Sequence, residues 1–456
     1  MAVCSIVDLA TVSIPLRYDS EYWRPEFLAF DKQVRTTGGL IKKYIKQIIQ
    51  PSEFLREYDT SPGNPEFWRS QNIKRGYIDR STAAFIDSSI FGSIPNAQVK
   101  EGDVLIVRTG VNAGDAATVP QGIERVAVSS HTLRIVPNDI STGYALGMFF
   151  ASDLGRSILH RVISGSSRKQ ITKEMIESLM VPDFSLIANE LVERTRQYYQ
   201  VQNQAIALYT EAEALLLREL HLGIVALPTA KTYTASFSEV MASERMDAEY
   251  YQPRYYALLS LLQKTGAAGR LGNYLRSPVK RGVQPSYVEG GELPVIKSQH
   301  IGARSIVLDD PDSRTSYEFG EIPKNRRALV GYEDVLLNST GMNTIGRCQP
   351  LLQKTNALAD GHVAILRCGA ALDPVYLSTF LNSTAGYMQT ERAWTGSSGQ
   401  IELRPELVED YTIWLAPMEL QRTIRDMIES AHQLRESATG LLAAAQKRVE
   451  EFIQRA

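Results

Sequence analysis

Basic side chains without acidic neighbours are the residues of this chain best suited to contact a charged partner. Residues 32–52, 154–173 and 264–288 each hold five Lys or Arg residues and no Asp or Glu, and three more basic residues gather at 324–327. Lys and Arg bind phosphate oxygens, and nearby Gln and Asn can reach the edges of bases. For any single stretch, a solvated charged face is the alternative. The clusters together favour nucleic acid.

The overall composition limits the classes of protein that these clusters can belong to. Lys and Arg number 49 against 51 Asp and Glu, so the chain is not a polycation and its basic groups must be locally segregated. A length of 456 residues predicts two or three folding units. No apolar run approaches the ~20 residues of a membrane span, and no secretory signal opens the chain.

Metal and disulfide chemistry are not indicated. The three cysteines, Cys4, Cys348 and Cys368, are too few and too scattered for a disulfide framework or a zinc site. The six histidines show no paired-ligand spacing. We therefore expect a cytoplasmic protein without a cofactor of its own.

The chain contains the same unit twice. Residues 17–25 (Arg-Tyr-Asp-Ser-Glu-Tyr-Trp-Arg-Pro) return as residues 245–253 (Arg-Met-Asp-Ala-Glu-Tyr-Tyr-Gln-Pro), an offset of 228. Asp-Val-Leu at 103–105 returns at 334–336, an offset of 231. Further pairs at one of these offsets are 70–73 with 298–301, Thr109-Gly110 with Thr340-Gly341, His131 with His362, and Gly-Ser-Ser at 165–167 with 396–398. An ordered series at a nearly fixed offset predicts two tandem units.

Each unit ends in a long amphipathic helix. Residues 186–222 contain no Pro or Gly, and positions 187, 191, 194, 198, 201, 205, 208, 212, 215 and 219 are mostly apolar. Positions 420, 424, 427, 431, 434, 438, 441, 445, 448 and 452 repeat this pattern after Pro417. This spacing is typical of helices that pack along their length. We expect the two helices, each roughly 50 Å long, to pack on each other in antiparallel orientation.

The rest of each unit predicts a mixed α+β fold. Short β-strands are expected at 102–107, 126–128 and 131–136, and again at 331–337 and 362–366, with helices at 144–162 and 374–392. The predicted architecture is two tandem α+β domains related by a pseudo-twofold and separated by two coiled-coil helices. The expected boundaries are 1–185 and 229–417 for the domains, and 186–228 and 418–456 for the helical spacers.

These duplicated motifs carry a family resemblance. The motif Arg-x-Asp-[Ser/Ala]-Glu-Tyr-[Trp/Tyr]-x-Pro opens each unit, a turn with Asp103 or Asp334 precedes a strand, and Gly-Ser-Ser with a following Gln-Ile (165–171 and 396–401) precedes each spacer helix. In this order the motifs resemble the specificity subunit of type I restriction–modification systems. The resemblance covers nearly the whole chain, and it lies in the duplicated order of the motifs.

The resemblance implies a DNA-binding subunit with no catalytic activity of its own. Each α+β unit would be a target-recognition domain that reads one half of a split double-stranded DNA site. The two helices would set the distance between the half-sites and dock two adenine-N6 methyltransferase subunits, which bind S-adenosylmethionine. Restriction and translocation subunits can join such a complex. Independently of the family, two modules on a rod of roughly 50 Å suit two DNA segments about one helical turn apart.

The duplication also separates scaffold residues from DNA-reading residues. Because half-sites usually differ, residues shared by both units should serve folding or docking, as expected for Gln71, Gln299, Thr109, Thr340, Gly165 and Gly396. Divergent basic and polar residues are the predicted DNA contacts. They are Lys42, Lys43, Lys46, Lys74, Arg75, Arg80, Arg168 and Lys169 in the first unit, and Lys280, Arg281, Gln284, Arg304, Lys324, Arg326 and Arg327 in the second.

Three alternatives remain open. Asn64-Pro65-Glu66-Phe67 is close to the Asn-Pro-Pro-Phe/Tyr motif that holds a flipped adenine in amino-methyltransferases, but it lacks the second proline. His131 and His362 could serve hydrolysis, yet each opens an apolar strand. A coiled-coil scaffold protein that reads no DNA would explain the helices alone.

Overall fold

The computed structural model describes residues 20, 22–53, 58, 63–162, 170–222, 227, 228, 230–396 and 401–455. These residues form two compact units. Unit 1 holds the described residues up to Asn203 together with 435–455, and unit 2 is Gln204–Leu434. Both boundaries fall inside the long helices α7 (Ala188–Glu219) and α14 (Met418–Arg455), so each unit contains part of each helix.

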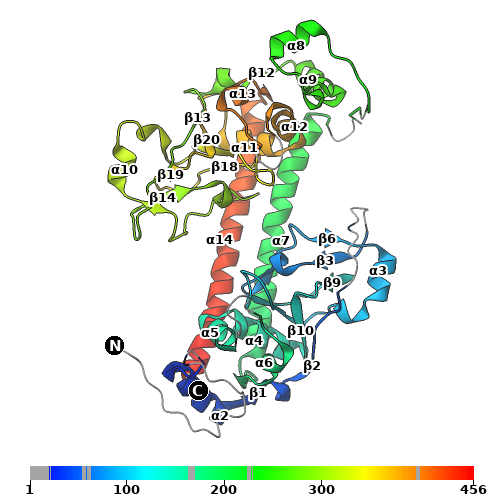
Figure 1. Ribbon diagram of the computed structural model, residues 1–456, viewed down its shortest axis with the longest axis vertical. Coiled ribbons are helices and arrows are strands. Elements are labelled where there is room, and N and C mark those ends of the chain that lie inside the picture. Colours follow the sequence, from blue (N-terminus) through cyan, green and yellow to red (C-terminus); the bar gives the residue numbers. More distant parts are fainter. Residues whose placement is uncertain are drawn as a thin grey trace. The chain divides into compact units, whose positions relative to one another are not determined.

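A four-stranded sheet forms the centre of unit 1 (Figure 1). Its strand order is β2 (Ile45–Ile49), β10 (Thr132–Pro137), β7 (Val104–Val107) and β8 (Ala116–Thr118). Every residue of β7 and β8 is buried, as the continuous apolar run of β7 predicts for a strand covered on both faces. A second sheet, β6 (Ala84–Phe85), β3 (Glu66–Trp68) and β9 (Val126–Val128), lies beside α3 (Ser88–Ser93).

Smaller elements complete unit 1. Helix α2 (Pro25–Thr37) leads into β1 (Gly38–Leu40), which pairs with β11 (Met180–Pro182) just before α7. The remaining elements are η1 (Ile41–Lys43), η2 (Ser70–Asn72), η3 (Pro95–Ala97), the hairpin β4 (Ile73–Lys74) and β5 (Tyr77–Ile78), α4 (Ile140–Ala151), α5 (Asp153–Val162) and α6 (Lys173–Glu177).

Unit 2 repeats this plan. Its central sheet has the order β13 (Lys280–Arg281), β20 (Val363–Leu366), β17 (Val335–Asn338) and β18 (Cys348–Pro350). Its second sheet has the order β15 (Arg314–Thr315), β14 (Leu293–Ile296), β19 (Ala357–Ala359) and β16 (Leu329–Val330), and β12 (Ala268–Arg270) pairs with β21 (Thr412–Trp414). The other elements are α8 (Phe237–Ser243), η4 (Ala248–Tyr251), α9 (Pro253–Lys264), η5 (Leu271–Tyr274), η6 (Ser298–His300), α10 (Tyr317–Glu321), η7 (Arg326–Ala328), α11 (Pro374–Asn382), α12 (Thr384–Ala393) and α13 (Pro405–Glu409).

The two units agree in strand register as well as in strand order. Thr132 pairs with Val107 in unit 1, and the residues 231 positions further on, Val363 and Asn338, pair in unit 2. In the second sheets, β3 pairs with β9 in parallel, as β14 does with β19. The tandem α+β fold predicted from the repeat is therefore confirmed, including the strands expected at both copies.

The helices expected at 144–162 and 374–392 are each broken once. Unit 1 has α4 and α5 with Ser152 in extended conformation between them, and unit 2 has α11 and α12 separated in the same way by Ser383. A glycine follows three residues after each serine. A Cβ on Gly155 would lie 1.8 Å from the Phe149 carbonyl oxygen, and one on Gly386 would lie 2.3 Å from the Leu381 Cα. The absence of a side chain lets the second helix fold back closely on the first.

The long helices pack on each other in both units, as expected. In unit 1, the Arg448 guanidinium near the end of α14 lies 3.0 Å from the Glu190 carboxylate near the start of α7. In unit 2, the rings of Tyr209 and His432 meet edge to face, with 5.7 Å between their centroids. The helices therefore run antiparallel.

The buried stripe of each helix differs from the predicted one at several positions. Leu191, Tyr198, Ala205 and Ala212 are buried as expected, as are Ile424, Ala431, Ala438 and Ala445. The intervening buried residues lie one place later than predicted, at Thr195, Tyr209 and Leu216 in α7 and at Ile428, Leu442, Val449 and Ile453 in α14. The half-buried neighbours Leu208, Leu215, Met427 and Leu441 widen the stripe, because each helix also packs against the core of its unit. No helix in the described ranges is long and apolar enough to cross a membrane.

Candidate nucleic-acid interface

Three of the predicted DNA contacts line one open groove in unit 2. Gln284 lies in the segment after β13, while Lys324 and Arg327 flank the start of η7. The groove has a volume of about 720 Å³. Its lining is Gly282, Val283, Gln284, Phe319, Pro323, Lys324, Asn325 and Arg327. Those eight described residues include two cations, two amides and no carboxylate, which suits an anionic partner.

Buried backbone contacts hold the two walls of the groove. Asn325 is 2% exposed, and its side-chain amide donates to the Phe319 carbonyl at 2.8 Å. This bond fixes the turn on which Lys324 and Arg327 stand exposed. On the other wall, a Cβ on Gly282 would lie 1.9 Å from the Ala359 carbonyl oxygen, so a glycine is required there. Gly282 thereby lets the chain pass close to β19 before Gln284 reaches the mouth.

Unit 1 presents a different surface. Lys46 is exposed on β2, and it lines a cavity of about 370 Å³ together with Gln47, Lys100, Glu101 and Asp103. Carboxylates and ammonium groups are mixed in this cavity. This cavity and the groove of unit 2 lie at different places in the repeated fold and differ in charge.

Other predicted contacts of unit 1 have protein partners. The Lys42 ammonium lies 2.9 Å from the Glu177 carboxylate, and the Lys43 ammonium lies 5.3 Å from the centroid of the Tyr44 ring. Arg75 donates to the Ala151 carbonyl and pairs with Asp153 at 2.6 Å, so it closes the end of α4. Lys74 is half-buried on β4.

Arg80 makes a two-pronged ion pair with Glu66, with 3.0 Å from its Nε to the nearer carboxylate oxygen. Burial alone would raise the pKa of Glu66, but hydrogen bonds from Arg80 and from the Trp68 indole outweigh it and lower that pKa. Arg80 therefore stabilises the start of β3, the central strand of the second sheet. Arg168 and Lys169 lie outside the described residues.

Several predicted contact arginines of unit 2 also have protein partners. Arg281 pairs with Glu402 and donates to the Leu403 carbonyl at 2.8 Å. Arg326 pairs with Glu321 at 3.1 Å. Arg304 stacks on Tyr209 of α7, with 5.1 Å from its guanidinium carbon to the ring centroid. Lys280 is exposed on β13. Sequence alone could not separate Arg281 and Arg304 from Arg327, because their partners lie far away along the chain.

The described residues that the units share have structural contacts. Gln71 donates to the Thr82 hydroxyl at 3.3 Å, and Gln299 lies 3.4 Å from the His300 ring. Thr109 and Thr340 form equivalent isolated bridges, with Gln170 and Glu402 respectively. Gly396 has a φ of 108°, which favours glycine, whereas Gly165 lies outside the described residues.

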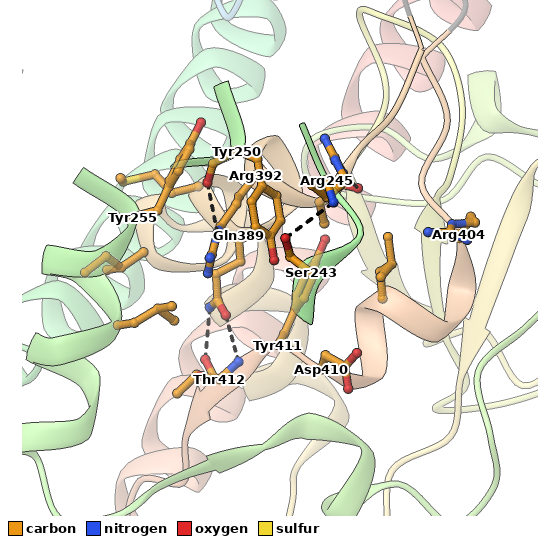
Figure 2. A pocket seen from close by; sticks show the side chains of 15 residues that line it. Ser243, Arg245, Tyr250, Tyr255, Gln389, Arg392, Arg404, Asp410, Tyr411 and Thr412 are labelled. Carbon is orange, nitrogen blue, oxygen red and sulfur yellow. Dashed lines mark hydrogen bonds between the residues drawn. The ribbon is translucent and has the colours of Figure 1, made fainter. Parts of the chain in front are cut away.

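The opening motif of unit 2 serves the fold in a way that the sequence did not reveal (Figure 2). Both oxygens of Asp247 accept hydrogen bonds from Arg245 at 2.6 Å, and Arg245 also donates to the Ala393 and Trp394 carbonyls. Arg392 of α12 lies 4.3 Å from the Tyr250 ring centroid. Arg245 thereby ties this motif to the end of α12, and Arg245, Tyr250 and Arg392 border a small pocket of about 170 Å³. In the unit 1 copy, 17–25, the residues Arg17, Tyr18, Asp19 and Glu21 lie outside the described residues.

The residues that suggested an enzyme are engaged elsewhere. Phe67 is fully buried and Glu66 is held by Arg80 and Trp68, so the Asn64–Phe67 segment offers no open face for a flipped base. His131 lies 3.1 Å from the Thr109 hydroxyl at a strand end. Within the described ranges no group of three His, Cys, Asp or Glu residues could hold a metal ion.

No protein-family model matches the chain, and the comparison with curated proteins gave no match. Among solved structures, the chain is similar to a type I restriction–modification S subunit from M. genitalium (TM-score 0.42, 10% identity, 91% of this chain and 94% of that one). It is also similar to the HsdS subunit from Thermoanaerobacter tengcongensis (TM-score 0.28, 13% identity, 91% and 93% covered). A third similar chain comes from work on complex assembly and conformational transition of the type I R-M system (TM-score 0.30, 12% identity, 91% and 96% covered). These structures come from the system that the duplicated motifs resemble.

Proposed function

We propose that this chain is the specificity subunit of a type I restriction–modification system. In this role it catalyses nothing, reads a bipartite DNA target with its two α+β units and docks adenine-N6 methyltransferase subunits onto it. The observation that carries the proposal is the repeated strand register of two units that differ in their exposed basic and polar side chains. One fold used twice with two surfaces suits a split site with unlike halves.

The groove of Gln284, Lys324 and Arg327 supplies the test of DNA binding. Each cation that neutralises a phosphate releases a counterion, so affinity falls with salt in proportion to the number of contacts. The double variant Lys324→Ala with Arg327→Ala should bind DNA more weakly. Its log affinity should also fall less steeply with log salt, by about 2 in the slope. Binding of duplex DNA would be followed by fluorescence anisotropy at several salt concentrations, with DNA that carries the methylated target.

The matched control is Lys354→Ala with Arg422→Ala, one exposed Lys and one exposed Arg of unit 2 outside the groove. This variant should bind DNA like the unaltered chain. Equal losses in both variants would mean that net charge alone attracts DNA. No salt-dependent binding by the unaltered chain, alone or with the methyltransferase, would favour the coiled-coil scaffold alternative.

Partner docking has a separate readout. The chain co-expressed with the adenine-N6 methyltransferase subunit of its own system should give a complex of one specificity chain and two methyltransferases. Native mass spectrometry measures this ratio directly. The proposal would be contradicted by a methyltransferase complex that assembles without this chain. It would also be contradicted by DNA methylation that this chain carries out alone.

A further inference from the structure

Gln284 presents an amide without a protein partner in the groove of unit 2. The residue is exposed, and its side chain forms no hydrogen bond with any described residue. A glutamine side chain carries hydrogen-bond donors and an acceptor on one amide group. This arrangement matches the N6 amino group and the N7 atom of adenine in the major groove of DNA, so glutamine can bond both atoms at once. The Gln284 amide therefore has the chemistry of an adenine reader.

The backbone on both sides of Gln284 is fixed by hydrogen bonds within unit 2. Before it, the Val283 amide donates to the Ala359 carbonyl at 3.1 Å. After it, the Ser286 carbonyl accepts a hydrogen bond from the Thr315 hydroxyl at 2.6 Å. Hydrogen bonds to a base weaken steeply when distance or angle changes, so a side chain that reads a base needs a firm support. Gln284 has this support before any DNA is bound.

Phe319 of α10 lines the same groove with an aromatic ring. The side chain is half-buried, because it packs against the apolar cluster that includes Leu293 and Leu358. Phenylalanine is one of the apolar side chains that contact the C5 methyl group of thymine in the major groove. Thymine is the partner of adenine, so the amide and the ring together suit the two bases of one A·T pair.

Lys324 and Arg327 supply the charges that a DNA backbone requires. Both are exposed, and neither forms an ion pair with a residue that the structure describes. Glu321, the acid nearest to Lys324 in the sequence, is already paired with Arg326 at 3.1 Å. Cations that bind phosphates hold the duplex in place but do not distinguish one base from another. The groove thus brings backbone-binding groups and base-reading groups together.

The same positions in unit 1 hold different residues. Strand pairing aligns the two units at an offset of 231, both before Gln284 and after Arg327. At this offset the places of Gln284, Phe319, Lys324 and Arg327 are taken by Glu53, Ser88, Ser93 and Asn96. A carboxylate has no donor, so Glu53 could not bond adenine as a glutamine does. Residues that read unlike half-sites must differ between the units, and these do.

We propose that Gln284 reads an adenine in the half-site of unit 2, with Phe319 against the methyl group of the paired thymine. Lys324 and Arg327 bind the phosphates beside this base pair. The inference rests on the proposed function and adds one base pair of the target and the residues that recognise it. Loss of the Gln284 amide should therefore relax the target at one position of one half-site and leave the other half-site unchanged.

The test measures the base preference of Gln284→Ala in complex with the methyltransferase. Methylation mapping with the unaltered chain first defines the target. Synthetic duplexes then carry each of the four base pairs at each position of that target, and fluorescence anisotropy gives their affinities. In Gln284→Ala the preference for A·T should fall by about ten- to hundredfold at one position, the effect of losing one two-bond contact to a base. Preferences at all other positions should stay as they are.

Gln353→Ala is the matched control, because Gln353 is an exposed glutamine of unit 2 that does not line the groove. It should keep every preference, and both variants should keep the melting temperature of the unaltered chain. Unchanged preferences in Gln284→Ala would overturn the inference, as would a lost preference for a pair other than A·T. An equal loss of affinity for all duplexes would also overturn it, since Gln284 would then hold the backbone only. Failure of the unaltered complex to methylate or bind any bipartite target would instead overturn the proposed function.

Discussion

The Arg304 guanidinium stacks on the Tyr209 ring, and the Arg304 carbonyl accepts a hydrogen bond from the Tyr209 hydroxyl at 3.1 Å. Tyr209 belongs to α7, whereas Arg304 lies in the turn between Ile301 and Ile306, which form an isolated antiparallel bridge. Unit 1 uses its equivalent hairpin in the same way, since the Tyr199 hydroxyl of α7 accepts a hydrogen bond from the Ile78 amide at 2.9 Å. Tyrosines of α7 thus anchor a hairpin in each unit.

Arg304→Ala should therefore affect stability more than DNA binding. Loss of the stacked cation should cost about 1 kcal/mol of unfolding free energy, measured by urea denaturation. Tyr209→Phe keeps the ring and removes only the hydroxyl, so it should cost less. A DNA affinity that falls in Arg304→Ala as far as in the groove variant would restore Arg304 as a DNA contact.

Ala at Gly155 or Gly386 should destabilise the protein. An added methyl group must displace the backbone of the preceding helix, which costs typically 1–3 kcal/mol or more. Gly440→Ala in α14 is the control, because a Cβ there meets nothing within 4 Å. It should stabilise the helix by roughly 0.5–1 kcal/mol. Equal effects at the three sites in thermal unfolding would contradict the close packing at the two helix breaks.

A lower pH should weaken the ion pair between Arg245 and Asp247 in unit 2. Hydrogen bonds from Arg245 and its positive charge hold the pKa of Asp247 below its ordinary value, although burial acts in the opposite direction. A lowered folded-state pKa means that this stabilisation is present above the unfolded pKa of about 4 and is lost as the pH falls through the folded pKa. Asp247→Asn should be less stable than the unaltered chain at pH 7. The difference should shrink toward pH 3, and a difference that is constant with pH would argue against the ion pair.

Removal of one heptad from each long helix should narrow the unread gap in the DNA target. Deletion of residues 200–206 from α7 and 433–439 from α14 takes out about 10 Å of helix, or about three base pairs of duplex. The bases that are read should not change, because the deletions remove residues of α7 and α14 only and leave the strands and loops of both units intact. Methylation mapping measures the gap, and an unchanged gap would refute a spacing role for the helices.

The sequence predicted the fold well where the two copies confirm one another. Two strands begin with the repeated Asp-Val-Leu, and α7 and α14 each carry an apolar stripe. Both features follow from local patterns that a single sequence displays directly. The breaks at Ser152 and Ser383 were missed, although Ser-x-x-Gly stands at both positions. The residues on both sides of each serine led to the prediction of one continuous helix.

The candidate site was predicted only in part. Charge runs singled out Gln284, Lys324 and Arg327, which line one groove, but they could not show which cations already have partners. Arg75, Arg80 and Arg304 contact residues or backbone far away in the sequence or on another element, and such pairings depend on tertiary structure. The contact of Arg245 with the Ala393 carbonyl at the end of α12 likewise depends on tertiary structure.

The central claim is that two sibling units read two halves of one DNA target. The most direct test is long-read mapping of N6-methyladenine in the host genome, with and without this gene. The account predicts a bipartite motif with a fixed gap that is methylated only when the gene is present. Methylation that persists without the gene, or a single uninterrupted motif, would contradict it.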